Sequence, residues 1–263
     1  RNAPRAVVLR RGPSAWVRLS LWHTDSDRFE HGQWFRGRVY EHRCDVSPDA
    51  SLFAYFAHKA PASPELGVDS WAALSRPPWF TALALWGVGT TYFAGGFFLD
   101  ARRLLLGGIR DRPDRGRLPQ HLRLVATAPY LDRTPEWTER TVYINRLLRD
   151  GWRAQPTPDA ARPLWEKHEP GGERRLLMTL ADEFVSGVWC IRRRNEYALT
   201  HRSDLQPLGH AEWADWDARG RLLLARAGRL WSIDPAGCLN LIEDFRAQQP
   251  DPQPSPPRAS EPP

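Results

Sequence analysis

Three consecutive arginines, Arg192, Arg193 and Arg194, lie between Trp189 and Tyr197 and are the best candidates for contacting a nucleic acid. Guanidinium groups contact phosphates, and aromatic rings stack on exposed bases. On a strand, Arg192 and Arg194 would point to one face and Arg193 to the other. The alternative is a solvated strand edge whose charges discourage pairing with another chain.

A second polar group, His23, Asp25, Asp27 and His31, could bring imidazole and carboxylate ligands to one divalent ion. The calcium-loop pattern is broken at Phe29, where an oxygen ligand is required. A polar connection between strands is therefore the preferred interpretation, and we expect neither a metal nor a cofactor.

Two pairs of carboxylates, Asp45 with Asp49 and Asp215 with Asp217, could divide acid and base roles. Their short spacing favours turn capping instead, because aspartate side chains in tight turns accept backbone N–H bonds. A hydrolase would need carboxylates that meet in a central channel from different parts of the chain. We expect no catalytic residue in these pairs.

Motifs for nucleotide and hydrolytic chemistry are missing. Gly87-x-Gly89 is followed by Tyr92 where the dinucleotide motif needs a third glycine. The chain contains no GxSxG elbow, and the run from His168 to Gly172 departs from the zinc motif HExxH. The sequence thus predicts a protein that is not an enzyme.

The basic net charge could indicate a polyanionic partner such as nucleic acid, or nothing specific, and the interleaving of basic and acidic residues favours the second. The net charge is +6, and Lys59 and Lys167 are the only lysines, so arginine carries nearly all of the positive charge. The three cysteines, Cys44, Cys190 and Cys238, are far apart and odd in number, which argues against a disulfide framework and favours a reducing cytoplasm.

The uncharged stretch from Pro77 to Leu99 is long enough to cross a bilayer, but its prolines and glycines divide it into two apolar runs. We therefore expect two buried strands there and no membrane partner.

A turn acid followed by a short apolar run recurs along the chain, as in DVSPDASLFAYFA (45–57), FFLDARRLLL (97–106) and ADWDARGRLLLARAGRLWSI (214–233). This pattern predicts strand, tight turn and strand. Strands are expected at 15–22, 122–126, 141–148 and 164–167, and a hairpin at 33–43 around Arg36-Gly37. One or two helical turns are expected at 182–185 and at 241–247.

The turn acids recur about every 50 residues, with a longer last interval, as the blades of a β-propeller do. The fold class is therefore predicted to be all-β, a small propeller-like array of about five four-stranded blades (four to six), with a pair of β-sandwiches as the alternative. The 13 tryptophans, spread along the chain, fit small hydrophobic clusters between packed sheets.

The first and last of these apolar segments resemble blades of WD40-like and TolB-like propellers, and the segment 70–86 is similar to bacterial proteins of unassigned activity. The resemblance implies a fold and no catalytic residue, since propellers host many unrelated functions. The Gly-His and Trp-Asp pairs of true WD40 repeats are absent, because Trp216-Asp217 falls at a turn.

Residues 1–246 are expected to form the propeller-like domain, and residues 247–263, with seven prolines in 17 residues, a disordered tail. The tail would be a linker or a ligand for an SH3-like groove. The leading functional hypothesis is a non-enzymatic module that binds another protein through loops rich in tryptophan and arginine. The alternatives are a nucleic-acid-associated subunit and a propeller hydrolase.

Overall fold

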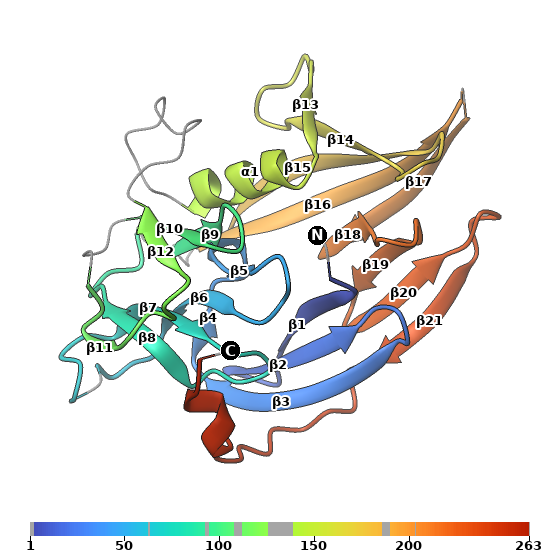
Figure 1. Ribbon diagram of the computed structural model, residues 1–263. Coiled ribbons are helices and arrows are strands. Elements are labelled where there is room, and N and C mark those ends of the chain that lie inside the picture. Colours follow the sequence, from blue (N-terminus) through green and yellow to red (C-terminus); the bar gives the residue numbers. More distant parts are fainter. Residues whose placement is uncertain are drawn as a thin grey trace. The chain divides into compact units, whose positions relative to one another are not determined.

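The structure of the protein is a computed structural model that describes residues 3–62, 64–92, 95–107, 112–125, 139–185, 190–202 and 204–262. The chain divides into two compact units, unit 1 (Arg1–Arg146 and Gln249–Pro263) and unit 2 (Leu147–Gln248). Almost all regular structure in both units is β (Figure 1).

Unit 1 contains three sheets. Their orders are β1-β2-β3, β11-β8-β7-β6-β4 with β5 beside β6, and β12-β10-β9. All strand pairs are antiparallel except β10 with β12. The strands are β1 (Arg5–Arg11), β2 (Trp16–His23), β3 (Arg28–Arg36), β4 (Arg38–Val39), β5 (Asp45–Val46), β6 (Phe53–His58), β7 (Ser70–Ser75), β8 (Ala82–Gly87), β9 (Gly95–Phe98), β10 (Arg103–Gly107), β11 (Arg115–Gly116) and β12 (Arg123–Val125).

Unit 2 contains two antiparallel sheets, of order β13-β14-β15-β16-β17 and β18-β19-β20-β21. Its strands are β13 (Arg153–Gln155), β14 (Leu164–His168), β15 (Arg175–Val185), β16 (Cys190–His201), β17 (Asp204–Ala211), β18 (Trp213–Trp216), β19 (Leu222–Arg226), β20 (Arg229–Ile233) and β21 (Leu239–Asp244). The α-helix α1 (Glu139–Arg149) begins in unit 1 and ends in unit 2, and short 3₁₀ helices occupy Glu41–Arg43 and Pro257–Ser260.

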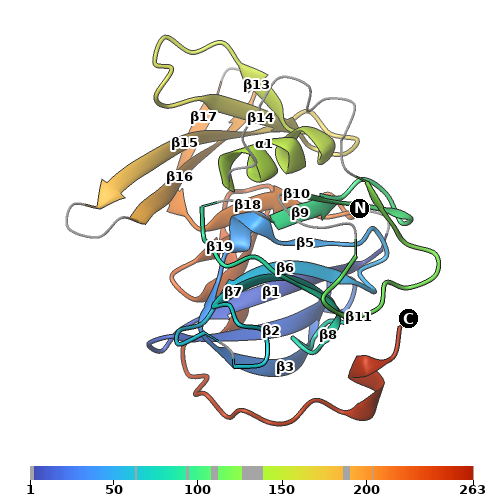
Figure 2. The same cartoon turned by 90° about the vertical axis from the view of Figure 1, so that its left-hand side faces the viewer.

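The core of unit 1 follows from the alternation of side chains along its strands. On β6, Phe53 and Tyr55 point to one face, where they pack with Leu19 of the sheet β1-β2-β3, whereas Ala54 packs on the other face with Phe98 of β9. Apolar layers thus separate successive sheets, as between neighbouring propeller blades. Figure 2 shows β1, β2 and β3 layered against the strands β6 and β7.

The predicted fold class is confirmed. The chain is a nearly all-β array of small, mainly antiparallel sheets, five among the described residues. They hold three to six strands each, where four were expected. The expected strands at 15–22 and 164–167 correspond to β2 and β14, and the uncharged stretch 77–99 contains β8 and β9. The described residues contain no helix that is long and apolar enough to cross a membrane.

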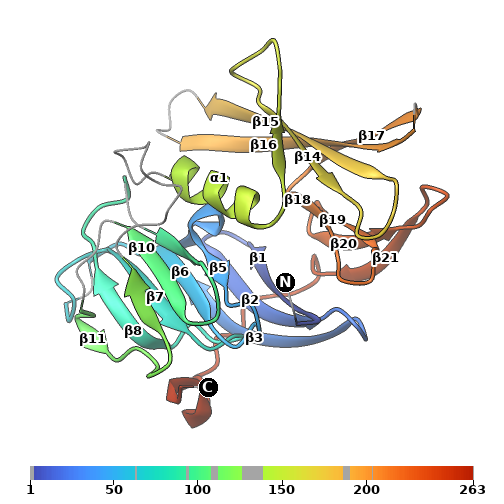
Figure 3. The same ribbon diagram turned by 45° about the horizontal axis from the view of Figure 1, so that its top comes forward.

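The strand predicted at 141–148 is wrong, because these residues form α1. The β-branched residues Thr141, Val142 and Ile144 suggested a strand. In the helix, Val142 is fully buried against Phe97 and Leu105, so that α1 covers the sheet of β9 and β10 (Figure 3). Tertiary packing outweighs the local preference for extended structure here.

The helical turns predicted at 182–185 and 241–247 are also wrong. Residues 182–185 continue β15, and residues 241–244 continue β21. In both places the pairing with a neighbouring strand supplies the backbone hydrogen bonds that a short helix would have made alone.

The segment 33–43 is not the expected hairpin. Strand β3 ends at Arg36 in one sheet, and β4 starts at Arg38 in the next sheet, paired with β6. Gly37 is the single residue between the two strands. The chain therefore passes from one sheet to its neighbour at Gly37 and does not reverse.

The predicted domain 1–246 with a separate tail stays a prediction; the observed units place the segment from Gln249 in unit 1. This segment makes ordered contacts there. The Thr81 hydroxyl lies 2.6 Å from that of Ser255, and Ala259 is fully buried. Asp251 interacts electrostatically with Arg18 of β2. Burial of even one small side chain anchors a proline-rich segment whose backbone has little freedom to lose.

Candidate anion-binding site

The passage at Gly37 brings together side chains from two sheets of unit 1. Trp16 of β2 lies opposite Arg36 of β3, and Arg38 of β4 lies opposite His58 at the end of β6. The Gly37 N–H donates to the carbonyl of Ala15 at 2.8 Å, which fixes the junction against the start of β2. Directly opposed residues on antiparallel strands have neighbouring side chains, so basic groups gather on both sides of the junction.

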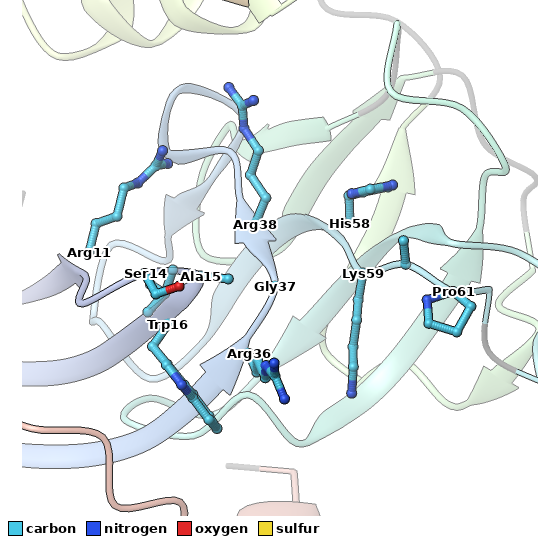
Figure 4. A pocket seen from close by; sticks show the side chains of 12 residues that line it. Arg11, Ser14, Ala15, Trp16, Arg36, Gly37, Arg38, His58, Lys59 and Pro61 are labelled. Carbon is cyan, nitrogen blue, oxygen red and sulfur yellow. The ribbon is translucent and has the colours of Figure 1, made fainter.

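A cavity of about 740 Å³ opens at this junction. Figure 4 shows Trp16, Arg36 and Lys59 extending to one side of the strands, while Arg11 and Arg38 extend to the other. The lining of this cavity contains four permanent cations, one histidine and no acid. The twelve lining residues are Arg11, Ser14, Ala15, Trp16, Val17, Arg36, Gly37, Arg38, His58, Lys59, Ala60 and Pro61.

Some of these basic groups already have partners. The Arg11 guanidinium lies 2.6 Å from the Glu41 carboxylate, and His58 lies 3.4 Å from that of Asp69. Arg38 stacks on an aromatic ring, with 4.5 Å between its guanidinium carbon and the ring centroid of Tyr40.

The other two cations of the lining, Arg36 and Lys59, have a different environment from Arg11 and Arg38. Within the described parts of the chain, no carboxylate forms an ion pair with Arg36 or Lys59. Two exposed cations in one cavity without a neutralising acid create a positive potential there. The site is therefore suited to an anion, and arginine forks match the geometry of phosphate oxygens.

The lining also carries side chains that can act as nucleophile or base, namely Ser14, His58 and Lys59. Among these described residues, no hydrogen bond joins Ser14 to His58, whose imidazole instead lies near Asp69.

The arginines Arg192, Arg193 and Arg194 lie on β16, as the alternation argument required. In the backbone register, Arg192 is opposite Glu183 and Arg193 is opposite Asp182 on β15. Their side chains lie outside what the structure describes. The nucleic-acid contact at these three residues therefore stays a prediction.

The first pair of aspartates separates into two structural roles. Asp49 accepts the backbone N–H of Ser51 at 3.1 Å, as a turn cap does. Asp45 is buried and accepts the backbone N–H of Phe98 at 2.8 Å, while its other oxygen lies 3.7 Å from the guanidinium of Arg146. Both carboxylates are engaged in holding the fold.

The second pair divides in the same way. Asp217 accepts the backbone N–H groups of Arg219 and Arg221, each at 2.9 Å, so turn capping is confirmed there. Asp215 instead lies 2.6 Å from the ammonium of Lys167. Burial raises the pKa of Asp215, and the nearby ammonium opposes that shift.

The histidines of the proposed metal cluster have separate partners. His23 lies 2.7 Å from the Glu30 carboxylate, and His31 lies 3.1 Å from the Ser20 hydroxyl. Among the described residues, no group of three or more histidine, cysteine, aspartate and glutamate side chains converges in a way that could hold a metal ion. The structure thus does not bring the four candidate ligands, His23, Asp25, Asp27 and His31, together in a metal site.

Sequence reasoning missed the basic cavity, although two signals for it exist. One is the run Arg36-Gly37-Arg38, where glycine allows a change of direction between two cations. The other is Lys59, one of two lysines in a chain that otherwise uses arginine. Neither shows that residues 11 to 16 and residue 59 meet, because that contact depends on how β2 and β6 are placed.

Comparisons with known proteins give little further guidance. No family model and no curated protein matches the chain. One solved structure, a Bacteroides fragilis protein provisionally assigned as a 6-phosphogluconolactonase, is similar over 92% of this chain and 95% of that chain, with 10% identity and a TM-score of 0.39. No family model supports a WD40 or TolB assignment; a β-rich, propeller-like fold stands.

The leading functional hypothesis, a non-enzymatic module that binds another protein, is corrected. The similar structure is named as an enzyme and not as a scaffold. At this identity and TM-score the likeness assigns no activity to the present chain.

Proposed function

We propose that unit 1 binds a phosphate-bearing ligand in the basic cavity at the Gly37 junction. One observation carries the proposal: Arg11, Arg36, Arg38 and Lys59 line a single cavity whose lining has no acid. Phosphate oxygens accept charge-assisted hydrogen bonds from such groups.

The energetics favour an anionic ligand over an empty site. Like charges held in one cavity repel each other, and the two cations without described carboxylate partners, Arg36 and Lys59, add to this repulsion. A bound anion removes the repulsion and gains hydrogen bonds. The ligand should therefore stabilise the folded state in proportion to the logarithm of its concentration.

This proposal retains part of the nucleic-acid hypothesis, since nucleic acids and small organic phosphates present the same oxygens. It places the contact in unit 1, at residues different from Arg192, Arg193 and Arg194. A small ligand fits a cavity of this size, whereas a strand of nucleic acid needs an extended basic groove.

The experiment is a thermal-unfolding titration with inorganic phosphate against sodium chloride at equal ionic strength. We expect phosphate, but not chloride, to raise the melting temperature, by about 2 to 4 °C for each kcal/mol of stabilisation. The double variant Arg36→Gln/Lys59→Gln should bind phosphate at least roughly tenfold more weakly, since each lost charged hydrogen bond is worth about 1.5 kcal/mol or more.

The matched control is Arg5→Gln/Arg123→Gln, which removes the same charge from exposed positions of unit 1 outside the cavity. This control should respond to phosphate as the unchanged protein does. Equal responses to phosphate and chloride, or equal losses in the two double variants, would refute the proposal.

A further inference from the structure

A second cavity, of about 630 Å³, adjoins the basic one in unit 1. Lys59 and Pro61 line both cavities, so the two spaces meet at the start of the loop after β6. The second cavity differs in chemistry, because its walls are mainly aromatic and aliphatic side chains, including Phe35, Trp71 and Leu66.

The aromatic walls are held in fixed positions by each other. The ring of Phe35 meets Trp71 edge to face at 5.9 Å between centroids and lies 5.6 Å from Phe80. Tyr55 meets Phe80 edge to face at 5.4 Å. Such a cluster presents a preformed apolar surface, which is the usual lining of a site for a small organic molecule.

Two polar side chains of this second cavity, Tyr55 and Gln33, are already engaged in contacts within the protein. The Tyr55 hydroxyl donates to the Phe80 carbonyl at 2.6 Å, and the Gln33 side-chain oxygen accepts the Phe80 N–H at 2.8 Å. A ligand group placed here would gain from contact with ring faces and edges more than from hydrogen bonds. A planar apolar group satisfies this requirement, whereas a sugar does not.

We infer that the ligand is an aromatic phosphate ester, with its phosphate in the basic cavity and its ring in the aromatic cavity beside Phe35 and Trp71. This inference rests on the proposed function. Lys59, shared by both cavities, would contact the phosphate while its methylene groups lie beside the ring. Stacking of a ring on aromatic side chains adds a measurable part of the binding energy.

The test compares three probes by calorimetry: inorganic phosphate, 2-naphthyl phosphate and 2-naphthol. We expect 2-naphthyl phosphate to bind at least about tenfold more tightly than inorganic phosphate, a difference of about 1.4 kcal/mol. 2-Naphthol, which lacks the anion, should bind more weakly than 2-naphthyl phosphate.

The variant Phe35→Leu should remove most of this tenfold advantage and leave the affinity for inorganic phosphate unchanged. Leu66→Ala, at a half-buried position of the same wall, serves the same purpose if Phe35→Leu proves unfolded by circular dichroism. Arg36→Gln should weaken the binding of both phosphates equally.

The outcomes separate the two proposals. If inorganic phosphate binds but the naphthyl ester binds no more tightly, the inference about the aromatic cavity is wrong and the proposed function stands. If the ester's advantage survives in the wall variant that folds, its ring binds elsewhere and the inference is again overturned. If neither phosphate binds, the proposed function itself fails.

Discussion

Arg174 holds an ionised carboxylate in the turn between β14 and β15. Its guanidinium donates to the Glu169 carboxylate at 2.5 and 2.9 Å and lies 4.9 Å from the ring centroid of Trp216. Both charged side chains are only 15% exposed. Hydrogen bonds from Arg174 hold the pKa of Glu169 below its ordinary value of 4.5.

Glu169→Gln should therefore lower the free energy of unfolding by roughly 1.5 to 3 kcal/mol at pH 7. Because the folded-state pKa is depressed, the contribution is present above pH 4.5 and is lost as the pH falls through the folded-state value. The gap between the variant and the unchanged protein should narrow in acid, as measured by urea unfolding at several pH values. Glu173→Gln, at a 71% exposed carboxylate in the same turn, is the control and should cost little. A gap that stays constant with pH would contradict the assignment.

At the scale of elements, the passage from β3 to β4 depends on the absence of a side chain at Gly37. A Cβ there would lie 2.5 Å from the ring of Phe35 and 2.7 Å from the carbonyl oxygen of His58, and the backbone φ is +157°. Gly37→Ala should destabilise the protein by about 1 to 3 kcal/mol, the cost of strain and overpacking. It should also weaken phosphate binding, because Arg36 and Arg38 flank this residue.

Gly67→Ala is the matched control for Gly37→Ala. Gly67 also has a positive φ, of +67°, but no atom lies within 4 Å of an added Cβ. This variant should show only the conformational cost and keep full phosphate binding. Thermal unfolding with and without phosphate measures both effects, and equal behaviour of the two variants would show that the steric contact at Gly37 is not what forms the site.

Some strands of the fold could be predicted from the sequence alone, whereas the helix α1 and the basic cavity could not. Strands marked by sequence alternation, such as β2, or by a short apolar run beside a turn acid, such as β19 after Asp217, could be predicted. The helix α1 could not be predicted, since Val142 and Ile144 favour strands locally and only the packing of Val142 on Phe97 and Leu105 reveals its context. The basic cavity was missed for a related reason. Its cations come from three separate stretches of sequence, and only strand pairing brings them together.

At the scale of the whole molecule, the C-terminal segment of the chain belongs to unit 1. Residues 147–248 form unit 2, and the segment after them rejoins unit 1. The anchoring point is Ala259, whose side chain is fully buried in a 3₁₀ helix, with the contact of Thr81 to Ser255 nearer the boundary. The final segment should therefore contribute to the stability of unit 1 and not to that of unit 2.

Ala259→Asp tests this assignment, since a buried unpaired carboxylate would displace the segment. Hydrogen exchange should then accelerate in β2, where Arg18 loses Asp251, and in β8, which directly follows Thr81, the partner of Ser255. Strand β19 of unit 2 should keep its protection. Ser260→Asp places the same charge at the adjacent exposed position and should leave exchange unchanged. Acceleration in β19 as well would mean that the segment stabilises both units, and no acceleration in either would mean that burial of Ala259 contributes nothing. Strand β2 also carries Trp16 of the basic cavity. Ala259→Asp should therefore weaken phosphate binding only if hydrogen exchange also accelerates in β2.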